Sequence, residues 1–154
     1  MSEPAPTRAG FSLGGSAMGL FPTYLPSFFA SPSERVVLAY TEQGIEGYAA
    51  DLGVTLELLP LTSSGVWVQN VEAKMPGRGT GARVLRALGH LADEHGVTLL
   101  LYAKPFGEDA MPLDALVAFY RKVGFQPDDG VVSPHPEYDF GGCPMRRPPN
   151  TASA

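Results

Sequence analysis

Cysteine is almost absent from this chain. Cys143 is the only cysteine among 154 residues. A single thiol can form no disulfide within the chain and cannot supply a zinc site built from several cysteines. Cys143 also lies outside the predicted helices and strands and has no adjacent base that would activate it as a nucleophile. The chemistry is therefore expected to come from other residues, with no metal site.

Long apolar runs and an excess of positive charge are missing as well. No segment reaches the ~18 consecutive apolar residues that a membrane span needs, and proline and glycine break the apolar stretch over 11–30, which argues against a secretory signal. We expect a cytoplasmic protein without membrane contact. The net charge of −5 disfavours a broad nucleic-acid-binding surface but does not exclude a local basic patch.

The length and composition predict one domain with irregular ends. A chain of 154 residues with 44% hydrophobic residues can bury a core. Proline and glycine predict an irregular N-terminal segment over 1–32, before a folded domain over 33–145 and a flexible tail over 146–154. Aromatic residues within 11–29 suggest that the N-terminal segment docks onto the core or a partner, and they favour a homodimer.

Hydrophobic periodicity predicts a hairpin in the first half of the chain. Apolar residues alternate over 54–59 and resume an extended pattern over 66–71, with turn residues between them. Before this hairpin, the stretch 34–52 fits a helical stripe only in part, because Gly44 and Gly47 weaken it.

The second half predicts a crossover between strands. A helix is expected from Ala82 to Gly96, followed by an apolar strand over 97–103 that is expected to be covered on both faces. A short helix ending at Gly124 and a last β region over 125–132 follow. Strand, helix and strand in this order indicate an α/β protein with a mixed sheet.

A glycine-dense loop lies between the hairpin and the long helix. The stretch from Met75 to Gly81 reads MPGRGTG, and the residues from Lys74 to His90 include four Lys or Arg and no Asp or Glu. Such a turn lets backbone N–H groups converge at the positive end of the following helix. This predicts a phosphate or pyrophosphate site, although the ending of a P-loop is missing and a dinucleotide site is disfavoured.

This loop and a later stretch resemble two motifs of the GNAT (GCN5-related) N-acetyltransferases. The sequence GRGTGA over 77–82 is similar to their acyl-CoA-binding motif, and FYRKVGF over 119–125 is similar to their FYxKxGF stretch. The resemblance covers roughly residues 54–145. It implies an acyl-CoA N-acyltransferase fold, with a mixed central sheet flanked by helices, and transfer of an acetyl group from acetyl-CoA to a primary amine.

The resemblance also implies roles for particular residues. The pyrophosphate of coenzyme A would be held through the backbone of consecutive residues, namely Arg78, Gly79, Thr80, Gly81 and Ala82. Val71 would offer its backbone to the pantetheine arm, and Tyr120 would be the general acid for the leaving thiolate. A purely structural role for Tyr120, as a core aromatic, remains open.

Two positions depart from the family pattern. Pro76 stands where the family usually has Gln or Arg, and proline lacks an amide donor. Leu113 stands where an Asn is frequent. These departures favour an alternative, a binding or scaffold module of the same fold without acetyl transfer. A nucleobase-modifying enzyme of the kind found in phages is a third reading, which the net charge of −5 disfavours.

The general base stays open at this stage. Glu72 is the first candidate, with a surface position as its alternative, and Gln69 and Asn70 could position a water. His135 could line the acceptor site together with Glu137 and Tyr138.

The acceptor, a small amine or a peptide, is not identified by the sequence. Asp109 and Asp114 could attract a cationic acceptor or could simply begin a helix. His90 and His95 are expected at the surface.

Overall fold

The computed structural model describes residues 30–75, 77–105, 111–139 and 141–150. The predictions for the segment 11–29, for Pro76 and for Asp109 lie outside these residues, as does the side chain of Tyr138. Within the described part, no helix combines the length and the apolar character needed to cross a bilayer.

The described part of the chain is built on a mixed five-stranded sheet with the strand order β1-β2-β3-β5-β4. Only β2 and β3 pair in parallel, whereas the other neighbours are antiparallel. The predicted hairpin and the α/β class are confirmed. The strands are β1 (Val54–Thr62), β2 (Gly65–Ala73), β3 (Thr98–Ala103), β4 (Gln126–Pro127) and β5 (Cys143–Arg147).

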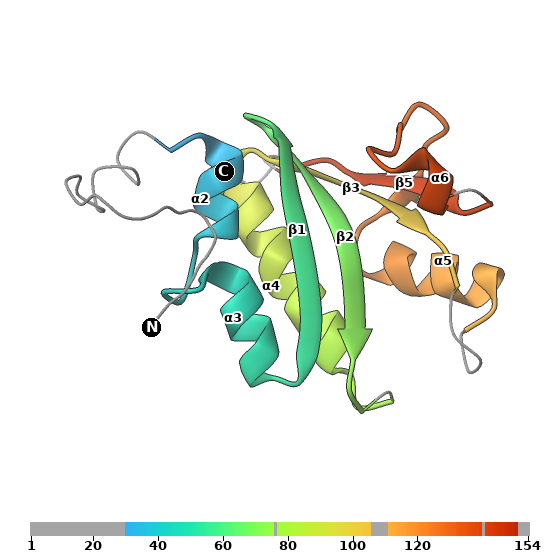
Figure 1. The fold of residues 1–154 in the computed structure, drawn as a ribbon, viewed down its shortest axis with the longest axis horizontal. Helices are drawn as coiled ribbons and strands as arrows, with labels where there is room; N and C mark the ends of the chain where they lie inside the picture. The colour runs from blue at the N-terminus through green and yellow to red at the C-terminus, as the bar shows by residue number, and fades with distance from the viewer. Residues whose placement is uncertain (1–29, 76, 106–110, 140, 151–154) are drawn as a thin grey trace.

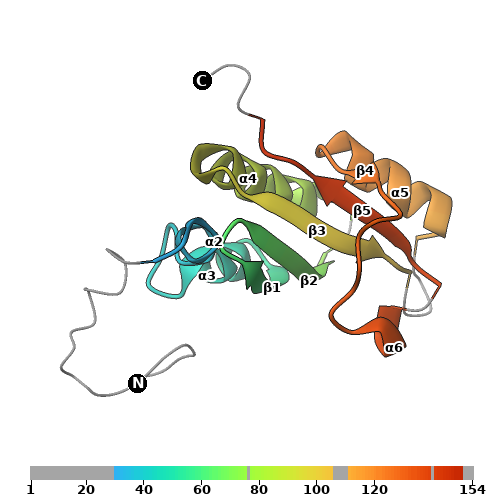
Figure 2. The ribbon, with the colours of Figure 1, turned by 90° about the horizontal axis from the view of Figure 1, so that it is seen from above.

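Helices cover the sheet unevenly. In Figure 1 helix α4 passes behind β1 and β2, α3 lies beside β1, and no described helix covers the front of these two strands. Figure 2 shows α4 and α5 on one side of β3 and β5 with α6 on the other. The helices are α2 (Pro32–Val37), α3 (Gly44–Asp51), α4 (Thr80–His95), α5 (Leu113–Lys122) and α6 (Pro136–Asp139).

The ambiguous stretch 34–52 forms two short helices. Ser31 caps α2, because its hydroxyl accepts from the Glu34 N–H at 3.2 Å while the Glu34 carboxylate accepts from the Ser31 N–H at 2.9 Å. The chain then turns so tightly that a Cβ on Gly44 would lie 2.1 Å from the Val37 carbonyl oxygen. Gly44 therefore separates the two helices instead of weakening one long helix.

The main core lies between the sheet and α4. The amphipathic face of α4 is buried there, and Gly96 ends the helix in a left-handed conformation at φ 69°, as predicted. The residues of α4 that the core buries are Val84, Leu85, Leu88, Leu91 and Ala92. A smaller apolar layer covers the opposite face, where Trp67 packs against Tyr102 and the Tyr102 hydroxyl donates to the Val131 carbonyl at 3.1 Å.

Two expectations for the second half are corrected. Only alternate residues of β3 are fully buried, while Leu100 and Tyr102 keep partial exposure. On this outer face the cover is the segment after β4 with the four-residue helix α6, which is smaller than the long helix α4 on the other face. The last β region is also displaced: β4 has two residues, and its longer partner β5 contains Cys143, which the sequence had placed outside any strand.

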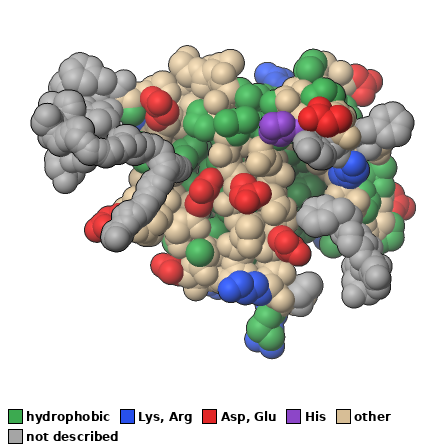
Figure 3. All heavy atoms as spheres, in the orientation of Figure 1, with side chains coloured by type: hydrophobic (Ala, Val, Ile, Leu, Met, Phe, Trp, Pro, Cys, Tyr) green, Lys and Arg blue, Asp and Glu red, His purple; other side chains and the backbone are tan. Residues whose placement is uncertain are grey.

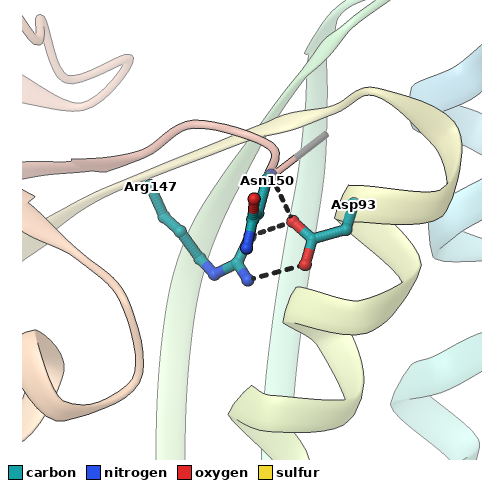
Figure 4. A network of polar contacts seen from close by, with 3 residues as sticks. All are labelled: Asp93, Arg147 and Asn150. Carbon is teal, nitrogen blue, oxygen red and sulfur yellow. Dashed lines mark hydrogen bonds and ion pairs between the residues drawn. The ribbon is translucent and has the colours of Figure 1, made fainter. Parts of the chain in front are cut away.

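The tail predicted over 146–154 overlaps the last strand of the sheet. Arg146 and Arg147 belong to β5, which lies between β3 and β4 inside the sheet. Arg147 donates to both carboxylate oxygens of Asp93 on α4, at 2.8 and 3.1 Å, and the Asn150 N–H donates to the same carboxylate at 2.7 Å (Figure 4). These hydrogen bonds attach residues 147–150 to α4, although the prolines and arginines of this segment are typical of a flexible C-terminal tail.

Candidate functional site

The two parallel strands of the sheet diverge after a short contact. β2 and β3 pair only from Gly65 with Thr98 to Trp67 with Leu100, after which β2 continues to Ala73 and β3 to Ala103 without further pairing between them (Figure 1). The other edges of these strands are occupied by β1 and β5. Within the described part of the chain, the facing edges beyond the divergence therefore carry backbone N–H and C=O groups without a partner strand. An extended amide-bearing chain can pair with such edges.

A β-bulge marks the start of this divergence. The register of β1 and β2 shifts between Glu57 with Asn70 and Leu58 with Val68, which leaves Gln69 as the extra residue of β2. Val71, whose backbone the family resemblance assigned to the pantetheine arm, pairs with Leu56 in the regular part of the hairpin beyond the bulge. Because of the extra residue, the side chains of β2 that face the core have even numbers before the bulge and odd numbers after it. Val71 therefore faces the core.

The bulge carries a polar contact to a distant loop. The Gln69 side-chain oxygen lies 3.1 Å from Nε2 of His135, and the His135 N–H donates to the hydroxyl of the buried Ser133 at 2.8 Å. Two of the candidates for the acceptor side are thus brought together beside the divergence of β2 and β3. Sequence reasoning named both residues but gave no sign of their contact across 66 positions.

The glycine loop ends in the open N-terminus of α4. Gly79 is the N-cap in a left-handed conformation at φ 76°, with no side-chain cap and no acidic residue in the first turn. The first helical hydrogen bond runs from the Arg83 N–H to the Gly79 carbonyl, so the N–H groups of Thr80, Gly81 and Ala82 precede the helical ladder. Gly77 and Gly79 face open space. These donors can hold an anion at the positive end of the helix.

Basic side chains surround this loop. Lys74, Arg78 and Arg83 are all exposed. Their charge adds to the positive end of the helix. The fourth basic residue that the sequence analysis counted, Arg86, lies further along α4 and lines a different cleft.

Helix α5 brings the second motif against the first. The Phe119 ring lies 3.9 Å from the position that a Cβ on Gly81 would take. Tyr120 follows on α5, with ring centroids 5.3 Å from Phe119 and 5.7 Å from Phe125. The two stretches that resembled family motifs are therefore neighbours in space.

Tyr120 combines a buried ring with a reachable hydroxyl. The residue is 9% exposed and belongs to the main core. Burial raises the pKa of Tyr120 to about 12. The Tyr120 hydroxyl makes no hydrogen bond with the described residues. It is nevertheless not among their fully buried polar side-chain atoms without a partner, since Arg147 Nε is the only such atom there. The Tyr120 oxygen therefore keeps contact with solvent. The phenol is thus a neutral donor at neutral pH.

The uncovered face of the hairpin is acidic. Glu57 faces Asn70 across the hairpin and Glu72 faces Thr55, and both glutamates are exposed. Figure 3 shows acidic side chains over the central part of this face, whereas the visible Lys and Arg side chains lie nearer its margins. Glu72 therefore lies at the surface, where a mobile acceptor can reach its carboxylate.

The remaining candidates have simpler positions. Asp114 lies in the first turn of α5 and accepts from the Ala115 N–H at 2.8 Å, which agrees with its helix-starting role. Leu113 is 38% exposed at the start of the same helix. His90 is exposed and His95 half-buried at the end of α4.

The comparison with solved structures gives a similarity to an anti-CRISPR protein. The crystal structure of the anti-CRISPR protein AcrVA5 matches with 22% sequence identity over 61% of this chain and 88% of that chain, with a TM-score of 0.48. A similarity of this size carries no conclusion about function. No protein-family model matches the chain, and no curated protein matches it.

Proposed function

We propose that this protein is an acyl-CoA-dependent N-acyltransferase of the GNAT type, which transfers an acetyl group from acetyl-CoA to a primary amine. The observation that carries the proposal is the divergence of β2 and β3 directly before an uncapped, acid-free helix N-terminus. These features give one ligand both an edge for its amides and a positive end for its phosphates. Coenzyme A has amides in its pantetheine arm and a pyrophosphate at one end of that arm.

The residues present fit this coenzyme. Backbone groups of Val71 and its neighbours on β2 would bind the pantetheine arm. The pyrophosphate would be held by backbone N–H groups of the glycine loop and of the first turn of α4, from Arg78 through Gly79, Thr80 and Gly81 to Ala82. No side chain has to move away from this turn, because Gly77 and Gly79 face open space.

The reaction needs one bond exchange and one proton transfer. The C–S bond of the thioester, which acetyl-CoA supplies when bound, breaks as the amine nitrogen forms a C–N bond to the same carbon. The amine loses a proton and the departing sulfur gains one. The chain's own residues have to orient the carbonyl, accept the first proton and supply the second.

Tyr120 is proposed as the general acid that gives its proton to the departing sulfur and regains one from solvent. Its pKa of about 12 means that the hydroxyl keeps its proton at neutral pH and can donate a hydrogen bond to negative charge that develops beside it. The helix α5 holds the ring rigidly, so the donor needs little reorganisation. This role is compatible with the core position of the ring, since only the oxygen has to face the ligand.

The acceptor is proposed to be a cationic amine that approaches over the acidic face of β1 and β2. Glu57 and Glu72 attract an ammonium group there, and Glu72 can accept its proton directly or through a water. His135, held against Gln69, is the second candidate for this proton. The same acidic face opposes the approach of a nucleic-acid backbone, which weighs against a nucleobase-modifying enzyme.

An assay of acetyl transfer tests this proposal. The full chain is incubated with acetyl-CoA and a panel of primary amines, including polyamines and lysine-containing peptides, while free thiol and acetylated amine are measured together. We expect amine-dependent thiol release, and we expect Tyr120→Phe to lower kcat by roughly 10²–10⁴-fold. Thiol release that does not depend on any amine would contradict the proposal, and coenzyme binding without transfer would support the scaffold alternative instead.

A further inference from the structure

A second basic region lies away from the proposed coenzyme site, in a cleft between α4 and the C-terminal end of α5. The cleft has a volume of about 260 Å³. Its lining includes four basic side chains and a single carboxylate. The residues are Arg86, His90, Asp93, Lys122, Val123, Gly124 and Arg147.

The carboxylate of this cleft is already used. Asp93 accepts from both terminal nitrogens of Arg147 and from the Asn150 N–H. Arg86, His90 and Lys122 are exposed and make no ion pair or hydrogen bond with any described residue. Asp93 forms an ion pair with Arg147, and the cleft lining contains no other carboxylate. The charges of Arg86 and Lys122 therefore make the cleft positive, although the chain has a net charge of −5.

Arg147 is held in a fixed orientation at the base of the cleft. Its side chain is only 14% exposed and packs over Gly89 and Gly124, where added Cβ atoms would lie 2.9 Å from guanidinium nitrogens. Asp93 takes one N–H from each terminal nitrogen, so each of these nitrogens keeps a second N–H. A guanidinium held in place by a carboxylate is well suited to bind a phosphate through such N–H groups, because little side-chain entropy is lost on binding.

We infer that this cleft binds a phosphate-bearing small molecule through Arg86, Lys122 and Arg147. The volume suits a phosphate group with a small organic part rather than a whole dinucleotide. The site is separate from the N-terminus of α4: His90 lies ten residues after Thr80 on the same helix, which corresponds to about 15 Å along its axis. The inference therefore does not depend on the proposed acyl transfer.

The test uses inorganic phosphate as the probe and ¹⁵N-labelled full-length protein. Phosphate is titrated against chloride at constant ionic strength, and backbone amide shifts are followed. We expect saturable shifts at Gly89, Val123 and Gly124. The double variant Arg86→Gln/Lys122→Gln should weaken phosphate binding at least about tenfold, because two charge-assisted hydrogen bonds are removed.

A matched variant separates this site from general electrostatic attraction. Arg35→Gln/Arg121→Gln removes the same charge from exposed positions, and neither residue lines the cleft or lies near the glycine loop in sequence. This control should change the phosphate affinity less than about twofold. Equal weakening by both double variants would overturn the inference. So would shifts confined to residues 79–82, or no saturable shift at all.

Discussion

The guanidinium of Arg147 on β5 donates to both carboxylate oxygens of Asp93 on α4, at 2.8 and 3.1 Å. This pair connects the last strand of the sheet to the helix that carries the proposed phosphate-binding turn at its other end. The two side chains keep 14% and 23% of their surface exposed. The contact is therefore only partly screened by water, and it should matter for the stability of the whole domain.

Replacing Asp93 by Asn should destabilise the protein. The substitution leaves the Arg147 guanidinium in a largely buried position without its counter-charge. The loss for a fully buried pair is about 3–5 kcal/mol, and the remaining exposure reduces our expectation to about 2 kcal/mol. Chemical denaturation measures the change, and Asp129→Asn, at an exposed aspartate, should leave the free energy of unfolding nearly unchanged.

The same pair should make stability depend on pH in acid. The hydrogen bonds from Arg147, followed by the Asn150 N–H, hold the pKa of Asp93 below its usual range. The stabilisation by Asp93 is therefore complete above its unfolded pKa, near about pH 4, and is lost as the pH falls through the lower folded value. Denaturation between pH 2 and about 6 should show a shallower acid loss for Asp93→Asn. Parallel curves for the two proteins would disprove this assignment.

Deleting Gln69 should disrupt the hairpin far more than replacing it. The bulge residue allows Val66 and Val68 before it, and Val71 and Ala73 after it, to face the same core. Without the extra residue, the end of β2 would turn its apolar side chains to solvent and its polar ones inward. We expect the deletion to cost several kcal/mol, whereas Gln69→Ala, which keeps the bulge, should cost about 1 kcal/mol or less. Equal thermal stability of the two variants would contradict the register.

Tyr120 should keep its proton to a higher pH than an ordinary tyrosine. Since burial raises its pKa to about 12, the folded protein retains a proton that the unfolded chain loses near pH 10. The wild-type protein should therefore lose up to roughly 3 kcal/mol of stability between pH 10 and 12 through this residue. Tyr120→Phe should lack that loss and the final step of an ultraviolet titration, while Tyr102→Phe should keep the final step.

Glu72 and His135 can be distinguished as proton acceptors by paired variants. If Glu72 accepts the proton of the amine, Glu72→Gln should lower kcat about 10²-fold or more, whereas Glu57→Gln on the same face should affect mainly the KM for a cationic amine. A loss of kcat in His135→Gln, with Glu72→Gln unaffected, would assign the role to the histidine. Turnover unchanged in both variants would remove both residues from the proton transfer.

The sequence was sufficient for the elements whose signals are local. The alternation in β1, the apolar stripe of α4 with its Gly96 cap, and the stop at Gly124 all follow from short-range chemistry, and all are present. The bulge also left a local trace, since the apolar positions of β2 change from even to odd numbers after Val68. That change of parity could have placed an extra residue between Val68 and Val71 from the sequence alone.

Contacts between distant segments could not be predicted in the same way. Cys143 to Arg147 contains two arginines and a proline and has only Met145 as a large apolar residue, so its place inside the sheet depends on β3, β4 and Asp93. The contact of Gln69 with His135 likewise depends on how the loop after β4 covers Trp67. Such pairings arise from the assembled fold and leave no periodic pattern in the chain.

The central claim is that the divergence of β2 and β3 and the N-terminus of α4 together bind acetyl-CoA. Thermal unfolding with acetyl-CoA, coenzyme A or ATP tests it most directly, in a buffer without phosphate, because phosphate would compete for the proposed pyrophosphate site. A ligand at 100 times its Kd contributes ~2.7 kcal/mol, which raises Tm by roughly 5–11 °C for a domain of this size, at about 2–4 °C per kcal/mol. We predict this shift with acetyl-CoA and coenzyme A and a smaller one with ATP. Gly81→Glu places a carboxylate in the first turn of α4, where it should repel the phosphates and abolish the shift. A carboxylate at a helix N-terminus does not destabilise the helix, so the fold should be kept. The control Ala50→Glu on α3 should retain the shift. No shift at millimolar acetyl-CoA, or a shift that survives in Gly81→Glu, would contradict the account.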